Sequence, residues 1–150
     1  MADQTAERPS QRHGLQVSVF ALTRVLFEGP AQEVQAPALQ GNVAILPHHA
    51  PLLALLRPGE LTVTEQEGTH RWAISGGSLQ VLDGHVVVLA RDAILAEDIG
   101  LEQAEQELMQ ATAAATKYQP DAAKRNQLDQ QILWARARVA LARQALSKAD

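Results

Sequence analysis

The first half of the chain consists of short runs in which apolar residues recur at every second position. Within Leu15–Phe20, the apolar Leu15, Val17 and Val19 alternate with the polar Gln16 and Ser18, and this period is typical of a strand that buries one face. Further runs have the composition of strands: 31–36, 42–46, 60–65, 69–75, 78–82 and 85–90. Turn signals that contain glycine separate several runs, so the pattern favours an antiparallel β-sandwich or barrel. Asp83-Gly84 predicts a type I′ hairpin, because both central positions of that turn need positive φ.

The last third of the chain repeats apolar residues every three or four positions instead. Two series have the spacing of one helix face: Leu101, Ala104, Leu108, Ala111, Ala115 and Tyr118, then Leu128, Ile132, Ala135, Val139, Ala142 and Leu146. Gln119-Pro120-Asp121 separates them, because proline cannot continue a helix. The pattern therefore predicts an antiparallel hairpin of two helices. Alanine buries little surface, so we expect this hairpin to be marginally stable without a partner.

A change of composition near residue 100 divides these two parts. All nine glycines lie at or before Gly100, and ten of the eleven valines precede it. Valine and glycine suit strands and turns, whereas the alanine and glutamine that dominate afterwards suit helices. Asp3 and Glu7 lie in an N-terminal segment that lacks the apolar run of a secretory signal. The sequence therefore predicts an α+β protein with a disordered leader (1–14), a β-sandwich domain (15–96) and a helical hairpin domain (97–150).

Composition excludes several classes of protein. With 150 residues and 46% hydrophobic content, the chain can bury one aliphatic core, and Trp72 is its largest candidate member. No stretch is continuously apolar over the ~20 residues that a membrane span needs. The chain has no cysteine, which excludes disulfides, thiolate zinc sites and cysteine nucleophiles. A net charge of −4, with two Phe, two Trp and one Tyr, argues against nucleic-acid binding.

The two predicted helices differ in charge. In and just before the first helix, Lys117 is the one basic residue, and the acidic residues are Glu97, Asp98, Glu102, Glu105 and Glu107. The second helix is mostly basic: Lys124, Arg125, Arg136, Arg138, Arg143 and Lys148. One interpretation is that the charges complement each other within the hairpin. The other is that the basic helix leaves its neighbour and docks on an acidic partner.

The histidines do not have the pattern of a metal site. His48 and His49 are the first candidates, with His70 and His85 as conceivable further ligands. Adjacent side chains of an extended chain point to opposite faces, and no carboxylate lies at ligand spacing. We therefore predict no metal site and interpret the segment around His49 as a loop stiffened by its flanking prolines.

No group of residues has the pattern of a catalytic site either. Ser75-Gly76-Gly77-Ser78 lacks the nucleophile-elbow and phosphate-loop patterns, and it precedes a strand rather than a helix. It predicts a turn or bulge in which only glycine fits. The sequence thus predicts no enzymatic activity. A stand-alone sandwich metalloenzyme that uses the histidines is the least favoured alternative.

Three segments resemble the signature of a known family. They are Gly41–Leu53 (GNVAILPHHAPLL), Arg57-Pro58-Gly59 and Ile74–Val81 (ISGGSLQV). Their order and spacing resemble those of the epsilon subunit of the F-type ATP synthase, called delta in mitochondria: G-x-x-G-I-L-P-x-H-A-P-L-L, then P-G, then S-G-G-x-x-E-V. Ala44 stands where glycine is usual, and Gln80 replaces the usual glutamate. The resemblance extends over residues 15–147.

This resemblance implies a fold and a role. The implied fold is a sandwich of ten strands in two sheets, followed by two helices. In the family, the sandwich is a rotor part that contacts the gamma subunit and the membrane ring. The helical arm folds beneath the sandwich or extends towards the catalytic alpha and beta subunits, where it blocks ATP hydrolysis. We thus expect a non-catalytic subunit of a proton-transporting ATP synthase, on the cytoplasmic side of a bacterial energy-transducing membrane and not inserted into it.

The resemblance also points to interface residues. Asn42, which stands where an acid is often found, and His49 match positions in loops at the interface with the membrane ring and gamma. Within the arm, we expect these residues to carry inhibition: Trp134, Arg136, Arg138, Arg143 and Lys148. Trp134 lies beside the predicted stripe, which fits either partial burial or a contact with a partner.

A nucleotide-binding motif of some bacterial members, I/L-D-x-x-R-A, is matched only in part. Ile132–Ala137 resembles it, but Leu133 occupies the aspartate position. Arg136 matches the motif arginine and Arg143 a second basic position on the same helix face, so two guanidinium groups remain for phosphate oxygens. Leucine cannot replace the missing hydrogen-bond acceptor. We therefore expect no cofactor, and an arm that senses ATP stays an alternative.

Overall fold

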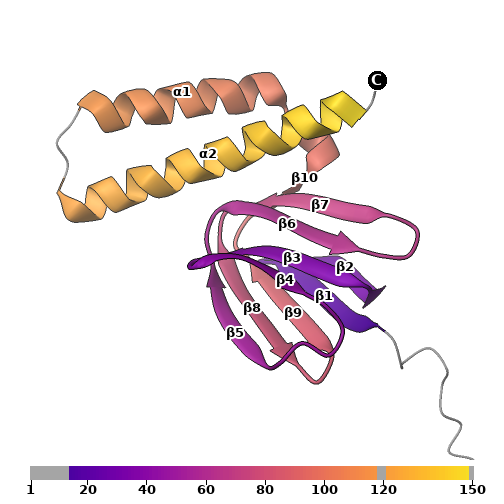
Figure 1. Cartoon of the computed structure of the whole chain (residues 1–150). Coiled ribbons are helices and arrows are strands. Elements are labelled where there is room, and N and C mark those ends of the chain that lie inside the picture. Colours follow the sequence, from indigo (N-terminus) through magenta and orange to yellow (C-terminus); the bar gives the residue numbers. More distant parts are fainter. Residues whose placement is uncertain (1–13, 118–120, 149–150) are drawn as a thin grey trace, which may run out of the picture.

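The computed structural model describes residues 14–117 and 121–148 (Figure 1). All of the predicted leader except Gly14 lies outside these ranges, as do Tyr118, Gln119 and Pro120. The strands are β1 (Leu15–Ala21), β2 (Arg24–Ala31), β3 (Glu33–Ala38), β4 (Gly41–Ile45), β5 (Leu52–Leu56), β6 (Gly59–Thr64), β7 (Thr69–Ile74), β8 (Gly77–Leu82), β9 (His85–Ala90) and β10 (Ala93–Leu95). The helices are η2, a short 3-10 helix (Ala96–Asp98), α1 (Leu101–Lys117) and α2 (Ala122–Lys148).

The strands form a sandwich of two layers. One layer has the order β4-β3-β6-β7-β10, and the other has the order β5-β8-β9-β1-β2. A single pair, Ala38 with Leu56, joins β3 to β5, so hydrogen bonding continues from one layer into the other. The predicted α+β class, with a ten-stranded sandwich followed by two helices, is confirmed.

The sandwich is not wholly antiparallel as predicted. β1 pairs with β9 in parallel, from Gln16 with His85 to Ala21 with Ala90. Parallel neighbours need a long crossover rather than a tight turn. Here the whole chain from β2 to β8 forms that crossover, and local alternation carries no information about such a distant pairing.

Three strands were not predicted: β2, β5 and β10. β2 contains Gly29-Pro30, which suggested a turn; the strand tolerates proline because it lies at the edge of its layer and pairs only with β1. β5 has the sequence LLALL, without alternation of apolar and polar residues. β10 is three residues long, too short to show a period.

The core between the layers is aliphatic, with one aromatic member. Trp72 is 2% exposed, which confirms its predicted place in the core. Fully buried branched side chains from both layers surround it, among them Val17, Val19, Val34, Ile45, Leu61, Val63, Ile74, Leu79, Val81 and Val86. Along each strand, the residues between these buried ones point to the outer face of their layer, because successive side chains of a strand point to opposite sides.

The two helices lie side by side, and α2 covers the outer face of β6 and β7 (Figure 1). Leu141, which is 1% exposed, packs with Ala73 of β7 and Ala96, and Trp134 packs against the same cluster. α2 therefore has a second apolar face that the single predicted stripe did not include. Leu146, the last residue of the predicted stripe, is 56% exposed, which corrects that prediction.

Candidate functional site

Asn42 lies in strand β4 and not in a loop as the resemblance implied. It pairs with Pro37 of β3 at the end of the sandwich where β3 turns into β4. Its Oδ1 accepts a hydrogen bond of 2.8 Å from Nη2 of Arg57, and Arg57 Nε donates to the carbonyl of Ala38 at 3.2 Å. The Asn42 side chain is thus held by a residue of the same chain.

His49 lies at the opposite end of β4. Its backbone N–H donates to the carbonyl of Leu46 at 3.1 Å, and its Nδ1 lies 2.6 Å from the carbonyl oxygen of Ala50. These contacts form a compact connection between β4 and β5, in which His48 has a φ of 69°. Asn42 and His49 therefore do not lie together, because β4 runs between them.

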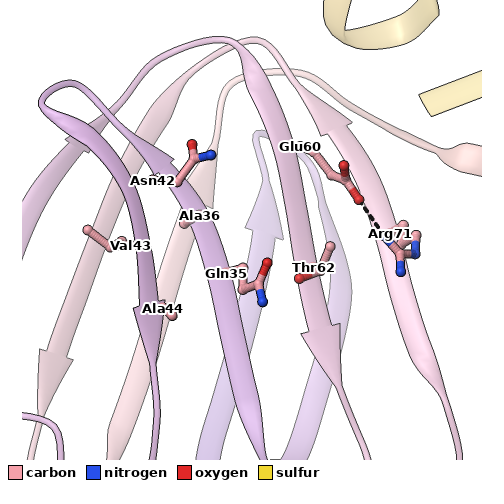
Figure 2. A pocket seen from close by; sticks show the side chains of 8 residues that line it. All are labelled: Gln35, Ala36, Asn42, Val43, Ala44, Glu60, Thr62 and Arg71. Atoms are coloured by element: carbon pink, nitrogen blue, oxygen red, sulfur yellow. Dashed lines mark hydrogen bonds and ion pairs between the residues drawn. The ribbon is translucent and has the colours of Figure 1, made fainter. Parts of the chain in front are cut away.

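A shallow groove of about 340 Å³ lies beside Asn42 on the outer face of β4, β3, β6 and β7 (Figure 2). Its polar side chains contact other residues of the protein. Arg71 Nη1 donates to Glu60 Oε1 at 2.7 Å, and Gln35 donates to Glu33 at 3.0 Å. Together with the Asn42–Arg57 bond, these contacts engage the Asn42, Gln35 and Arg71 side chains of the groove within the protein itself.

The histidines are held separately. His70 Nε2 lies 2.6 Å from Glu65 Oε2, and the ring stacks on Trp72 with centroids 5.8 Å apart. His85 Nδ1 lies 3.2 Å from the carbonyl oxygen of Asp83. Within residues 14–117 and 121–148, no three His, Asp or Glu side chains are grouped so that they could hold a metal ion.

The segment Ser75–Ser78 is not the tight turn or bulge that the sequence predicted. Ser75 and Gly76 connect β7 to β8 in the other layer, and Gly77 and Ser78 begin β8. Gly76 and Gly77 have φ values of 125° and 148°. A Cβ on Gly77 would lie 2.0 Å from the carbonyl oxygen of Leu89, so no other residue fits there. Ser75 Oγ donates to Asp92 Oδ2 at 3.0 Å and accepts from the Asp92 N–H at 3.0 Å, which ties this segment to the connection between β9 and β10.

Two of the four arginines of α2 pair with acids of α1. Arg138 Nη1 lies 2.5 Å from Glu107 Oε2, and Arg143 Nη2 lies 2.8 Å from Glu105 Oε1. The Arg138 guanidinium also lies 4.8 Å from the centre of the Trp134 ring. In this structure the charges therefore complement each other within the hairpin, which was the first of the two interpretations.

The other candidate residues of the arm lie on its surface. Arg136 and Lys148 are exposed, whereas Trp134 is half-buried. The groove between α1 and α2 is lined by Arg138 and Trp134, but not by Arg136 or Arg143. The two arginines of the partial nucleotide motif therefore do not line one groove in this structure.

The outer face of the β5-β8-β9-β1-β2 layer is a surface with few charges, which we call the open face. Strand pairing aligns two rows of outward residues across it: Leu55, Ser78, Leu89, Phe20 and Val25, then Leu53, Gln80, Val87, Ser18 and Glu28. Leu53 is 78% exposed, Leu55 is 64% exposed and Leu89 is 52% exposed. Glu28, at one edge, is the charged residue of these rows.

The open face was not predicted from the sequence, although one residue pattern indicates it. Leu89 stands between the buried Val88 and Ala90, at a position where alternation leads one to expect a polar residue. Exposed leucines at such positions form a patch of the kind that monomeric proteins rarely leave uncovered. The open face is therefore a candidate interaction surface.

Neither α1 nor α2, nor any other helix of the described residues, has the length and hydropathy of a membrane-spanning segment.

Comparison with known proteins agrees with the fold. The model of the family "ATP synthase, Delta/Epsilon chain, beta-sandwich domain" matches residues 14–96. The ATP synthase epsilon chain of Herpetosiphon aurantiacus is 39% identical over 100 residues, which cover 67% of this chain and 74% of that protein. The epsilon chain of a Synechococcus species is 34% identical over 125 residues, covering 83% and 91%, and that of Halorhodospira halophila is 46% identical over 87 residues, covering 57% and 62%.

Among solved structures, the fold is similar to a chain in the mitochondrial ATP synthase of Euglena gracilis, in an assembly of OSCP, F1 and c-ring. That match has a TM-score of 0.75 and 24% identity, and it covers 85% of this chain and 80% of the other. The signature segments, the ten-stranded sandwich with its helices, the family match and the epsilon-chain relatives lead to one conclusion. The chain belongs to the ATP synthase delta/epsilon chain family.

Proposed function

We propose that this chain is a non-catalytic rotor subunit of an F-type ATP synthase, which couples the gamma subunit to the membrane ring. The observation that carries the proposal is the open face. α2 packs on the β6 and β7 part of the other layer's outer face, whereas the open face presents leucines with one charged residue at its edge. Such a surface suits a permanent partner, because obligate interfaces are more apolar than the rest of a protein surface.

The gamma subunit is the proposed occupant of the open face. Burying an exposed leucine side chain stabilises a complex by roughly 1.5–3 kcal/mol, so a few leucines in two rows provide a strong contact. His49 leads into β5, whose Leu53 and Leu55 belong to the open face. We therefore assign His49 to the border of the gamma contact and Asn42, at the other end of β4, to the membrane-ring contact.

The helical arm is proposed to restrain ATP hydrolysis by a shift between two states. Arg138 and Arg143 pair with acids of α1 in the folded hairpin. In an extended state the same guanidinium groups, together with Arg136 and Lys148, would meet acidic surface on the catalytic alpha and beta subunits. The two states then compete for the same arginines, and a partner that binds one state better shifts the population.

We place this complex at the cytoplasmic side of a bacterial energy-transducing membrane. The chain would be held there by its partners and not by a membrane span of its own. The proposal for the arm includes no bound nucleotide, because Leu133 replaces the motif aspartate and Arg143 is paired with Glu105.

The test uses full-length chains with Leu55→Asp and Leu89→Asp in the open face. We expect affinity for an F-type catalytic complex that retains gamma but lacks this subunit to fall roughly 100-fold, because a carboxylate would be buried against the partner. Met109→Asp is the matched control, since Met109 is 72% exposed on α1 and lies outside the open face. Unchanged affinity of the two leucine variants, with their fold intact, would rule out the open face as the gamma contact.

A further inference from the structure

Arg57 connects three segments at the end of the sandwich where Asn42 lies. Its backbone N–H donates to the carbonyl of Pro37 at 2.8 Å. Its Nε donates to the carbonyl of Ala38, and its Nη2 donates to Asn42 Oδ1 at 2.8 Å. The corner between β5 and β6 is thereby fastened to both strands of the β3–β4 hairpin.

The turn of that hairpin is the exposed part of this end. Leu39, at its tip, is 58% exposed, and Gln40 beside it is also exposed. The N–H of Leu39 donates to the carbonyl of Leu55 at 2.9 Å, so the turn is tied to β5 as well. Its position therefore depends on contacts between residues that are far apart in the sequence.

The corner that carries Arg57 is rigid. Pro58 and Pro37 are buried, and proline restricts φ. A Cβ on Gly59 would lie 2.7 Å from Pro37 Cβ, so glycine permits the two segments to approach. This contact gives a physical reason for the Arg57-Pro58-Gly59 signature. Gly59 allows the corner to approach Pro37, and Arg57 then donates hydrogen bonds to Ala38 and Asn42.

The acceptors around the Arg57 guanidinium are neutral. They are a backbone carbonyl and an amide oxygen, and among the described residues no carboxylate forms an ion pair with Arg57. The positive charge of Arg57 therefore stays uncompensated within this end of the sandwich. A carboxylate in place of the Asn42 amide would accept from this guanidinium more strongly.

We infer that Asn42 acts through Arg57: the two residues form a clamp that positions the β3–β4 turn. The groups presented to a partner are then the side chains of Leu39 and Gln40 and the free edge of the Arg57 guanidinium. They fit a loop with exposed oxygen acceptors, carbonyl or carboxylate, and a small apolar surface. This inference rests on the proposed function, because the partner at this end is the membrane ring.

Two measurements on full-length chains test the Asn42–Arg57 clamp and the proposed contact with the membrane ring separately. The first is amide exchange of Leu39 in the isolated chain, which reports how firmly the turn is tied. Asn42→Ala and Arg57→Ala are expected to accelerate that exchange roughly 3- to 10-fold, and the double variant no more than Arg57→Ala. Asn42→Asp is expected to keep the turn at least as protected as in the natural chain.

The second measurement is the proton pumping per ATP hydrolysed by complexes reconstituted with each variant. We expect Asn42→Ala and Arg57→Ala to lower this ratio. Asn42→Asp should leave the ratio unchanged, because it keeps the turn protected although it adds a charge. Gln66→Ala, which removes an exposed amide from the β6–β7 connection, is the control in both measurements.

The outcomes are distinguishable. Additive effects of Asn42→Ala and Arg57→Ala on Leu39 exchange, or no effect of either, would overturn the clamp. A loss of coupling in Asn42→Asp with full turn protection would show that Asn42 itself meets the partner, which also overturns the inference. If exchange changes as expected but no variant alters coupling, the clamp stands and the proposed ring contact at this end is wrong.

Discussion

Arg138 of α2 and Glu107 of α1 form an ion pair that is more enclosed than the neighbouring pair of Arg143 with Glu105. Nη1 and Oε2 lie 2.5 Å apart, and the Arg138 side chain is only 13% exposed. The guanidinium also lies over the Trp134 ring at 4.8 Å, and Trp134 packs on the cluster that joins the arm to the sandwich. This pair therefore connects the packing of the two helices to the docking of the arm.

Glu107→Gln is expected to loosen the arm. Arg138 would keep its charge in a largely buried place without its carboxylate, which costs about 1–2 kcal/mol of hairpin stability. Amide exchange along α1 and Trp134 fluorescence measure the effect. Glu102→Gln, which removes an exposed acid of the same helix, should leave both unchanged. If the arm inhibits as proposed, Glu107→Gln also strengthens inhibition of ATP hydrolysis.

Leu141→Ala is expected to undock the arm from the sandwich. The side chain is buried against Ala73 and Ala96, and its loss should cost about 2–4 kcal/mol of docking free energy. Exchange at α2 should rise while exchange in the sandwich core stays slow. Leu146→Ala, at a 56% exposed position, should change exchange little. Equal protection of α2 in both variants would contradict the role given to Leu141.

Gly77→Ala is expected to destabilise the whole sandwich. A Cβ there would meet the carbonyl oxygen of Leu89 at 2.0 Å, and φ is 148°. Both problems together should cost more than ~3 kcal/mol in thermal or urea unfolding. Gly68→Ala is the matched control, because no atom lies within 4 Å of a Cβ at Gly68. A Gly77→Ala protein as stable as Gly68→Ala would mean that β8 does not approach the Leu89 carbonyl as closely as described.

Replacing Arg136, Arg138, Arg143 and Lys148 by alanine is expected to weaken inhibition of ATP hydrolysis and to leave assembly intact. The measurement titrates a subunit-depleted catalytic complex with natural and variant chains. The double variant Arg136→Ala and Lys148→Ala removes two exposed charges and keeps the pairs that Arg138 and Arg143 form with α1. Unchanged inhibition by the fourfold variant would refute a role of these charges.

Much of the fold follows from local patterns in the sequence. Alternation predicted β1 and most later strands, because burial of one sheet face imposes a period of two on the residues themselves. The Asp83-Gly84 hairpin was predicted from its turn chemistry, and the φ values of 50° and 78° confirm it. The boundary signals of the helices are equally local. The signature segments, likewise continuous in sequence, led to the family before any contact was known.

Only the tertiary structure decided the pairing of β1 with β9, the second apolar face of α2 and the surroundings of Asn42. Leu141 is one leucine among many on a helix, and its burial depends on Ala73, which lies on a distant strand. Arg57 and Asn42 meet because the sandwich brings two corners together. Such contacts depend on how distant segments pack, and the period of a strand or helix does not encode which segments become neighbours.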